Sequence, residues 1–234
     1  MRGAVFALAL LAFAPLAQAA PPVQIAPVLI DLPAKRPIAS VRLTNPSGEP
    51  LAFSATALAW TQENGADRLA PATDIIITPP AFVIRPGGEQ IVRLGSSSPA
   101  SDTERAYRLL FSQTLLRASE GGQLRMRYEL SLPLFLAPAK ARGDGLTVTQ
   151  WADALGKRQL RVENNANRRV QVLGAKLADA PVSLPRYLLA GASVTLPAPQ
   201  TQSAALRVSY ADASYALGER DLPLTANEPP RLAP

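Results

Sequence analysis

The sequence predicts an all-β protein of two sandwich domains. Apolar and polar residues alternate with a period of two along most of the chain, and 23 prolines and 14 glycines interrupt the segments before a long helix could form. A change of composition near residue 140 divides the chain into halves that each have about the length of an immunoglobulin-like sandwich. Because the sequence has no cysteine, packing alone must stabilise both halves.

The predicted strands are short and follow one another along the chain. They cover residues 41–44, 51–60, 75–77, 90–94, 105–116, 123–136, 146–151, 159–163, 170–177, 193–196 and 206–210. A series of about a dozen short strands with turns between them is typical of sandwiches.

The first residues predict export. Arg2 precedes an apolar run over residues 4–16 that is too short to cross a bilayer, and Ala17-Gln18-Ala19 has the pattern of a signal-peptide cleavage site. We expect a signal peptide over residues 1–19, with an uncleaved membrane anchor as the alternative. No later stretch approaches the ~20 apolar residues of a membrane helix, so the mature protein is not expected to be embedded in a membrane.

The domain boundary is predicted within residues 137–145, where small residues, Pro, Gly and charge replace the alternation found on both sides. We expect an N-terminal domain over residues 20–139 and a C-terminal domain over residues 140–234. The last residues, 227–234, contain three prolines and no periodicity, and we assign them no function.

The chain is mildly basic, with 24 Lys and Arg against 18 Asp and Glu. The basic residues lack the long run or aromatic interleaving of a nucleic-acid groove, so we predict solvated surface and no nucleic-acid partner. Examples are Arg125, Arg127, Arg158, Arg161, Arg168 and Arg169. The pair Asn164-Asn165 is typical of a turn or a strand end.

Catalysis is not expected. The sequence has no histidine or cysteine, which removes most general bases, nucleophiles and zinc ligands, and it lacks the Ser-x-x-Lys, Gly-x-x-x-x-Gly-Lys and Gly-x-Gly-x-x-Gly motifs. No cofactor and no metal is therefore predicted. Distant carboxylates can still meet after folding, but we interpret Glu104, Glu129, Asp212 and Asp221 as members of surface ion pairs.

The most informative segment covers residues 123–138. Its even positions are apolar, whereas its odd positions begin with polar residues. The apolar row is Leu124, Met126, Tyr128, Leu130, Leu132, Leu134 and Leu136, and the polar row starts with Gln123, Arg125, Arg127, Glu129 and Ser131. A strand of this length exceeds the usual ~5 to 6 residues, so its apolar row can serve both a core and something outside it. The alternative is a long core strand at the centre of a sandwich.

Several landmarks, taken in order, resemble the periplasmic chaperones of the chaperone-usher pilus pathway. They are the opening strand over residues 23–32, the turn after Leu43-Thr44-Asn45, the runs over residues 78–82 and 86–93, Tyr107-Arg108-Leu109, and the long strand that ends in residues 134–138. The resemblance covers most of the mature chain. It implies two immunoglobulin-like domains in a boomerang arrangement, a location in the periplasm, and a binding function in place of an enzymatic one.

In this family the long strand lends alternate apolar side chains to an incomplete pilus subunit. Such a subunit lacks a strand and so exposes unpaired backbone groups and a strip of core. The resemblance implies Leu124, Met126, Tyr128 and Leu130 as donor residues, with Leu132 nearer the cleft between the domains. The implied partners are pilus subunits and an outer-membrane usher that receives them, and self-association of the free protein is left open.

Two residues expected from this resemblance are missing. Family members carry a basic pair in the cleft that anchors the subunit's terminal carboxylate, but the matching positions here hold Val28 and Pro133. A later arginine is likewise replaced by Ala137, and the departure is similar to the archaic branch of the family. Because a carboxylate favours charge-assisted hydrogen bonds, we expect a substitute cation. The candidates are Arg108 first, then Arg93 and Lys140.

An exported structural subunit or adhesin with two immunoglobulin-like domains is the alternative function. It would share the export signal and the sandwich fold. A pilin, however, is expected to be a single incomplete domain with its own N-terminal extension, whereas this sequence predicts two complete domains and a donor-like strand near its middle.

Overall fold

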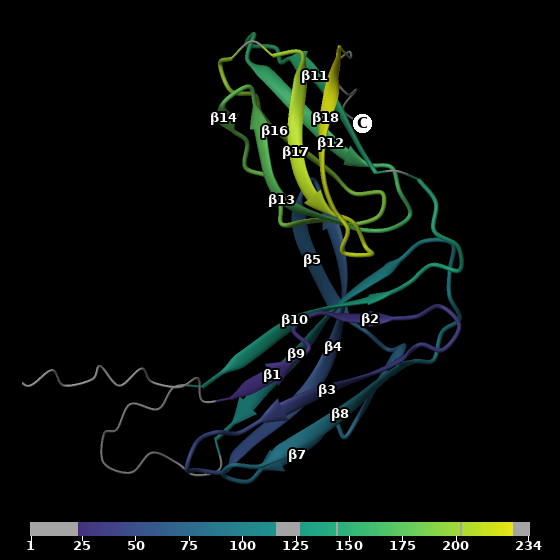
Figure 1. The fold of residues 1–234 in the computed structure, drawn as a ribbon, viewed down its shortest axis with the longest axis vertical. Coiled ribbons are helices and arrows are strands. Elements are labelled where there is room, and N and C mark those ends of the chain that lie inside the picture. Colours follow the sequence, from purple (N-terminus) through teal and green to yellow (C-terminus); the bar gives the residue numbers. More distant parts are fainter. Residues whose placement is uncertain (1–22, 116–126, 144, 202, 227–234) are drawn as a thin grey trace, which may run out of the picture.

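The computed structural model describes residues 23–115, 127–143, 145–201 and 203–226. All regular secondary structure within them is strand, which confirms the predicted all-β class. The strands form two sandwiches that meet at an angle and give the molecule a bent outline (Figure 1). The described residues contain no helix with the length and apolarity that a bilayer crossing requires.

The first sandwich consists of two sheets. One has the strand order β1 (Gln24–Ala26), β3 (Ile38–Thr44), β8 (Glu89–Ser96) and β6 (Ile75–Thr78). The other has the order β2 (Ile30–Leu32), β10 (Glu129–Leu136), β9 (Arg105–Thr114), β4 (Leu51–Glu63) and β5 (Ala66–Pro71), with β7 (Ala81–Ile84) also paired to β4. Alternate residues of the strands fill the core between the sheets, as a period of two requires.

The second sandwich is one continuous ladder of strands wrapped around a second core. Its order is β14 (Ala180–Pro181), β13 (Val170–Leu177), β17 (Ala205–Ala211), β18 (Leu217–Ala226), β11 (Leu146–Ala152), β12 (Arg158–Asn164) and β16 (Ser193–Pro197), with β15 (Tyr187–Leu188) paired to β13. The first core draws on residues up to Leu136 and the second on residues from Leu146. The boundary between residues 139 and 140 stays a prediction.

A buried asparagine ties a strand end to a neighbouring turn in the first sandwich. Asn45 follows β3 and is fully buried. Its Nδ2 donates to the carbonyls of Ile84 at 3.1 Å and Arg85 at 3.2 Å, and its backbone N–H donates to the carbonyl of Gly88 at 2.9 Å. Asn45 thus satisfies carbonyls that would otherwise be buried without a donor.

The second sandwich contains a corresponding buried asparagine at a strand end. Asn164 is the last residue of β12, in agreement with the predicted strand end, and it is also fully buried. Its Nδ2 donates to the carbonyls of Leu188 and Leu189, both at 3.0 Å, and its N–H donates to the carbonyl of Ala192 at 2.9 Å. In each domain, a buried asparagine side chain therefore donates to backbone carbonyls that would otherwise lack a donor.

The prediction of one opening strand over residues 23–32 is wrong. β1 pairs antiparallel with β3 in one sheet, and β2 pairs parallel with β10 in the other, so the chain changes sheets between them. The physical reason is that the core-facing positions change from odd-numbered to even-numbered residues. The inward-facing side chains are Val23 and Ile25 before the change and Ile30 and Leu32 after it, and a single strand cannot bury odd and even positions on the same face.

A smaller apolar cluster joins the two domains. It combines Trp60 and Phe135 of the first domain with Tyr187, Leu189 and Ala192 of the second. The ring centroids of Trp60 and Phe135 lie 5.9 Å apart, and each lies 5.7 Å from the ring centroid of Tyr187. Aromatic packing of this kind fixes how the domains face each other.

Candidate functional site

One edge of the long strand β10 is only partly covered. On one side it pairs antiparallel with β9 over its whole length. On the other side β2 pairs with it only from Leu134 to Leu136. Within the described ranges, no strand pairs with this second edge between Glu129 and Pro133. Here the second sheet of the first domain ends in an open edge.

The hydrogen-bond register shows which residues face that edge. The N–H of Gln113 in β9 donates to the carbonyl of Tyr128 at 2.9 Å. In an antiparallel ladder the bonding residues alternate, so the even-numbered residues of β10 bond to β9 and the odd-numbered residues face the other way. The N–H of Ala137, an odd-numbered residue, accordingly donates to the carbonyl of Leu32 in β2, also at 2.9 Å.

The open edge therefore presents a short set of backbone groups. Glu129 and Ser131 each direct an N–H and a carbonyl toward it. Pro133 adds no free group, because proline has no N–H and the register with β2 directs the N–H of Ile30 at its carbonyl. Unpaired edge groups of this kind are a template for pairing with another strand.

The predicted donor row lies partly within the described structure. Leu124 and Met126 lie outside the described residues. Tyr128 and Leu130 are half-buried, and Leu130 packs against the first core. Leu132 is 4% exposed and belongs to that core, because the inward-facing even row of β10 continues into it. In this part of the row, accessible side-chain surface is confined to Tyr128 and Leu130.

Arg108 lies on the outer face of the same sheet. Its neighbours Tyr107 and Leu109 are buried in the first core, so its side chain points to the opposite face, which it shares with Trp60. The guanidinium carbon lies 3.9 Å from the ring centroid of Trp60, and Nη2 lies 3.7 Å from Oδ2 of Asp67. The side chain, 22% exposed, leans toward β4 and β5 and away from β10.

The other two predicted cations lie elsewhere. Arg93 is on β8 between the buried Val92 and Leu94, so it faces outward from the first sheet, on the far side of the sandwich from Trp60. Lys140 is exposed after the end of β10, and its carbonyl accepts a hydrogen bond from Asn167 Nδ2 at 2.8 Å. The structure does not bring the three candidates together.

A buried arginine from the second domain forms ion pairs with two carboxylates of the first domain. Nη1 of Arg169 lies 2.7 Å from Oε2 of Glu104, and Nη2 lies 2.8 Å from Oδ1 of Asp31. The side chains of Arg169 and Glu104 are 2% and 1% exposed. Burial raises the pKa of Glu104, while the positive charge of Arg169 opposes that rise.

The prediction of solvated surface is wrong for Arg169, and the surface ion pair predicted for Glu104 is wrong too. The two residues are 65 positions apart, in segments that precede β13 and β9. No local pattern indicates such a meeting, because it depends on how the two domains pack. Arg169 is the main residue of the domain interface that sequence reasoning missed.

A tyrosine in the hairpin between β17 and β18 extends this network. The hydroxyl of Tyr215 donates to Oδ2 of Asp31 on β2. Burial and the neighbouring Asp31 carboxylate raise the pKa of Tyr215 to about 12. The residue has a φ of 64°, in the left-handed region that few residues other than glycine adopt. The second domain therefore holds β2 through two side chains, Arg169 and Tyr215.

On the opposite side of the domain interface, Gln62 near the end of β4 joins the two domains. Its Nε2 donates to the carbonyl of Tyr187 at 2.9 Å, and its Oε1 accepts from the N–H of Leu189 at 2.9 Å. One amide thus bonds to two backbone groups of the second domain. This contact and the Arg169 network lie apart along the interface, which favours a fixed angle between the domains.

The tip of the β4–β5 hairpin touches the second domain directly. Asn64 and Gly65 have φ values of 47° and 77°, as the turn of a two-residue hairpin requires. Oδ1 of Asn64 accepts from the N–H of Thr195 at 2.9 Å. A Cβ on Gly65 would lie 2.6 Å from Cγ2 of Val194, so only glycine fits at this contact.

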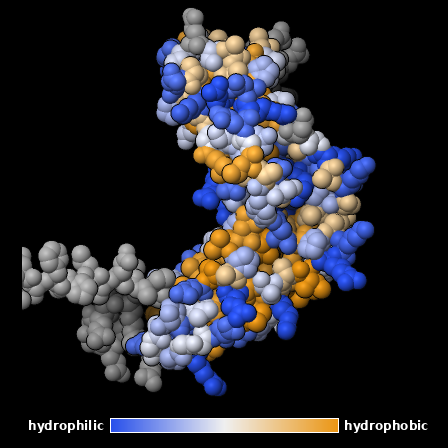
Figure 2. Space-filling view, viewed as in Figure 1, coloured by the Kyte–Doolittle hydropathy of each residue, from blue (hydrophilic) through white to orange (hydrophobic). Residues whose placement is uncertain are grey.

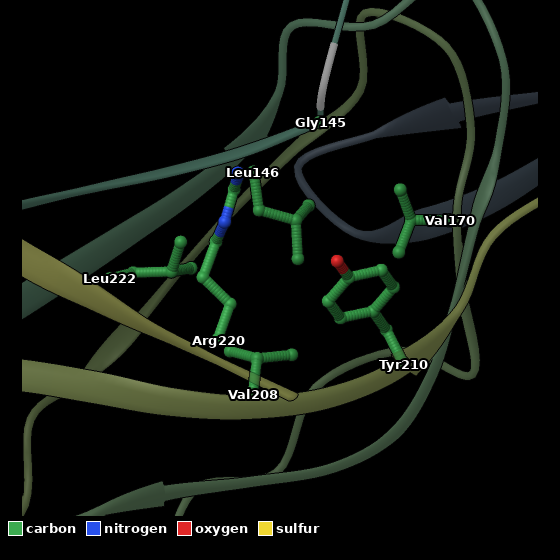
Figure 3. Close-up of a pocket in the computed structure, with 7 residues that line it drawn as sticks. All are labelled: Gly145, Leu146, Val170, Val208, Tyr210, Arg220 and Leu222. Carbon is green, nitrogen blue, oxygen red and sulfur yellow. The ribbon is translucent and has the colours of Figure 1, made fainter. Parts of the chain in front are cut away.

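Hollows occur between the domains and in the second domain. One lies between the domains beside Trp60, Gln62, Leu189 and Ala192. Figure 2 shows apolar residues gathered over the part of the first domain that meets the second. A cavity in the second domain, shown in Figure 3, has mostly apolar walls, with Tyr210 and Arg220 among its lining residues. Its volume is about 10 Å³, the lower limit for one water molecule, so we interpret it as a packing gap.

Comparisons with known proteins identify relatives of this architecture. The model of the family described as pili and flagellar-assembly chaperone, PapD N-terminal domain, matches residues 22–142. A comparison with curated protein sequences gives no match. Members of the matching family are chaperones and not enzymes.

Solved structures of pilus chaperones have the same fold. The CsuC–CsuE complex from the archaic Csu pili of Acinetobacter baumannii has a TM-score of 0.69 and 18% identity, and the match covers 88% of this chain and 99% of that one. The Escherichia coli chaperone DraB also has a TM-score of 0.69, with 12% identity and coverages of 87% and 96%. The Salmonella enterica SafA–SafB complex has a TM-score of 0.66, with 15% identity and coverages of 86% and 96%.

These similarities confirm the predicted fold of two immunoglobulin-like domains in a boomerang arrangement, and the alternative of a structural subunit is not favoured. The family match spans more than half of the 234 residues. The chain therefore belongs to the family of pilus-assembly chaperones.

Proposed function

We propose that this chaperone binds an incompletely folded pilus subunit by strand addition at the open edge of β10. The observation that carries the proposal is the unpaired edge between Glu129 and Pro133, beside the half-buried side chains of Tyr128 and Leu130. A subunit that lacks a strand exposes unpaired backbone groups and apolar core, and an added strand covers both. Leu124 and Met126 would continue the row of donor side chains.

The class of partner is supported by the relatives. The CsuC–CsuE structure is a chaperone bound to a tip subunit, and the SafA–SafB structure is a chaperone bound to a pilin. By analogy, the partner of this chain is a pilus subunit. The missing basic pair, replaced by Val28 and Pro133, is similar to the archaic branch of the family. Delivery to an outer-membrane usher completes the proposed role.

The proposed location is the periplasm. The apolar run over residues 4–16 and the Ala17-Gln18-Ala19 pattern support a cleaved signal peptide over residues 1–19. Processing of the expressed protein to a form that begins at Ala20 tests this part, and N-terminal sequencing of protein from the periplasmic fraction is the measurement.

Arg108 is the proposed anchor for the subunit's terminal carboxylate. It stacks on Trp60, a member of the cluster that joins the domains, and its ion pair with Asp67 is long, at 3.7 Å, and involves a half-exposed carboxylate, so little free energy opposes its release. Its guanidinium would have to turn from Trp60 toward β10, which four rotatable bonds permit. If it binds the carboxylate, its removal costs roughly 2 to 5 kcal/mol of affinity.

Co-purification tests the binding edge. The chaperone is expressed with the neighbouring secretion genes, and bound subunits are identified by mass spectrometry. Ser131→Pro removes the one N–H that this residue offers to a partner, whereas Ser131→Ala keeps it. Capture that is lost with proline and kept with alanine is expected. Equal capture by both variants would place the binding surface elsewhere.

The same assay tests the anchor. Arg108→Ala should lose most capture, and Arg108→Lys should recover part of it, because the charge survives without the bidentate fork. Arg93→Ala is the matched control, since Arg93 faces away from the cleft. Normal capture by Arg108→Ala would remove this residue from the mechanism.

A further inference from the structure

A buried amide ends the core-facing row of β9. Tyr107, Leu109 and Phe111 alternate along this strand and are buried in the first core. Gln113 is the next residue of the same row and is 9% exposed. A buried polar group costs free energy unless it is hydrogen-bonded, so an apolar side chain would suit this position better than an amide. The amide of Gln113 therefore requires a partner, and that partner lies on the neighbouring segment of chain.

Gln113 binds both backbone polar groups of Tyr128. Its N–H donates to the carbonyl of Tyr128 at 2.9 Å, and its side-chain Oε1 accepts from the N–H of Tyr128 at 3.2 Å. In a regular antiparallel rung the backbone carbonyl of residue 113 would accept that N–H. Here the side-chain oxygen takes the place of the backbone carbonyl.

This side-chain bond lies where the regular ladder ends. The pairing of β9 with β10 runs as far as Ser112 and Glu129, so Tyr128 is the first residue beyond it. Tyr128 is half-buried and belongs to the apolar row that continues along β10. Among the described residues, the contact between Gln113 and Tyr128 is the outermost hydrogen-bonded link between β9 and that row.

A side-chain acceptor suits this end of the strand. A backbone carbonyl has a direction fixed by its strand, whereas the amide of glutamine turns about several rotatable bonds. Gln113 can therefore keep the N–H of Tyr128 bonded at a place where the chain departs from the regular ladder. A binding strand that is already ordered loses less conformational entropy when a partner arrives.

We propose that Gln113 is a positioning residue for the partner-binding strand, which it holds at Tyr128 before a subunit arrives. The hold on Tyr128 is a property of the free protein. Its role in binding rests on the proposed function and concerns the same edge of β10. Gln113 acts through Tyr128 and through the row that Tyr128 begins in the described structure.

Hydrogen exchange of the free, full-length protein tests the hold. Gln113→Leu removes the side-chain acceptor, so the amide of Tyr128 should exchange roughly tenfold faster than in the wild type. Gln113→Glu keeps an oxygen acceptor and should restore slow exchange. Gln90→Leu is the matched control, since Gln90 ends the core-facing row of β8 and bonds to the carbonyl of Ile91, away from β10. It should leave the exchange of Tyr128 unchanged.

Capture of a co-expressed subunit tests the positioning role. Gln113→Leu should capture roughly fivefold less subunit than the wild type, with Gln113→Glu recovering most of the loss. Thermal unfolding of each variant establishes that the proteins compared are folded, and Gln113→Met repeats the removal of the oxygen with another side chain.

Two results would overturn the inference. Unchanged exchange of Tyr128 in both Gln113→Leu and Gln113→Met would show that the side chain does not hold this residue. Faster exchange with undiminished capture would show that the hold plays no part in binding. Equal capture by the wild type and Ser131→Pro would instead count against the proposed function, and the exchange result would stand on its own.

Discussion

The guanidinium carbon of Arg169, in the second domain, lies 3.8 Å from the ring centroid of Phe135, in the first. Phe135 is part of β10, the strand with the open edge. The second domain therefore contacts β10 close to the point where β2 pairs with it. The same arginine therefore contacts the strand with the open edge and takes part in the domain interface.

Arg169→Ala should destabilise the protein by about 3 to 5 kcal/mol, because it leaves Glu104 buried without its cation. Urea unfolding followed by tryptophan fluorescence is the measurement. Arg207→Ala is the control, since Arg207 forms only exposed ion pairs with Glu219 and Asp221. Similar losses for the two variants would show that the buried network is not a main source of stability.

The two buried asparagines should matter about equally. Asn45→Ala and Asn164→Ala each leave several carbonyls without a donor, and we expect a loss of about 3 kcal/mol for each. Asn165→Ala removes one exposed hydrogen bond, to Thr147, and should change the free energy of unfolding by less than about 0.5 kcal/mol. A cost at Asn164 as small as that at Asn165 would contradict the proposed equivalence of the two domains.

The hairpin tip provides a test of the fixed domain angle. Gly65→Ala places a Cβ against Val194 and should destabilise the protein by about 1 to 3 kcal/mol beyond the cost of its positive φ. Gly156→Ala has a similar φ of 73° but open space around it, so it isolates the backbone cost. Small-angle X-ray scattering should show a more open molecule for Gly65→Ala alone, and equal behaviour of the two variants would exclude a clamping role.

The bond between Tyr215 and Asp31 should make stability depend on pH in the alkaline range. The pKa of Tyr215 rises from 10.0 to about 12 on folding, so the folded state favours the protonated hydroxyl. This stabilisation is fully present below pH 10 and is lost as the pH rises through about 12. Wild type should therefore be more stable than Tyr215→Phe below pH 10, with the difference vanishing near pH 12. Parallel stability profiles across this range would show that the hydroxyl makes no such bond.

The alternation of apolar residues was enough to predict most of the strands. The predicted segment over residues 170–177 coincides with β13, and the segments over residues 105–116 and 193–196 overlap β9 and β16. β18 was missed because Leu222 is its one buried residue, so no alternation marks it. β5 was missed for the same reason, since all of its residues are exposed.

The site was harder to predict, because it depends on contacts between distant segments. The sequence indicated the apolar row of β10, but it could not show that Leu132 faces the core of its own domain. Nor could it show that Arg108 stacks on Trp60, or that Arg169 crosses the domain interface to reach Glu104. These relationships follow from strand register and domain packing, which a local pattern does not contain.

Exchange rates of individual β10 amides, measured with and without a captured subunit, test the central claim most directly. The N–H groups of Glu129 and Ser131 face the open edge, whereas those of Leu130 and Leu132 bond to β9 in the free protein. We predict that capture slows exchange at Glu129 and Ser131 by at least roughly tenfold and changes Leu130 and Leu132 little. Unchanged exchange at Glu129 and Ser131 in a stable complex would contradict strand addition at this edge.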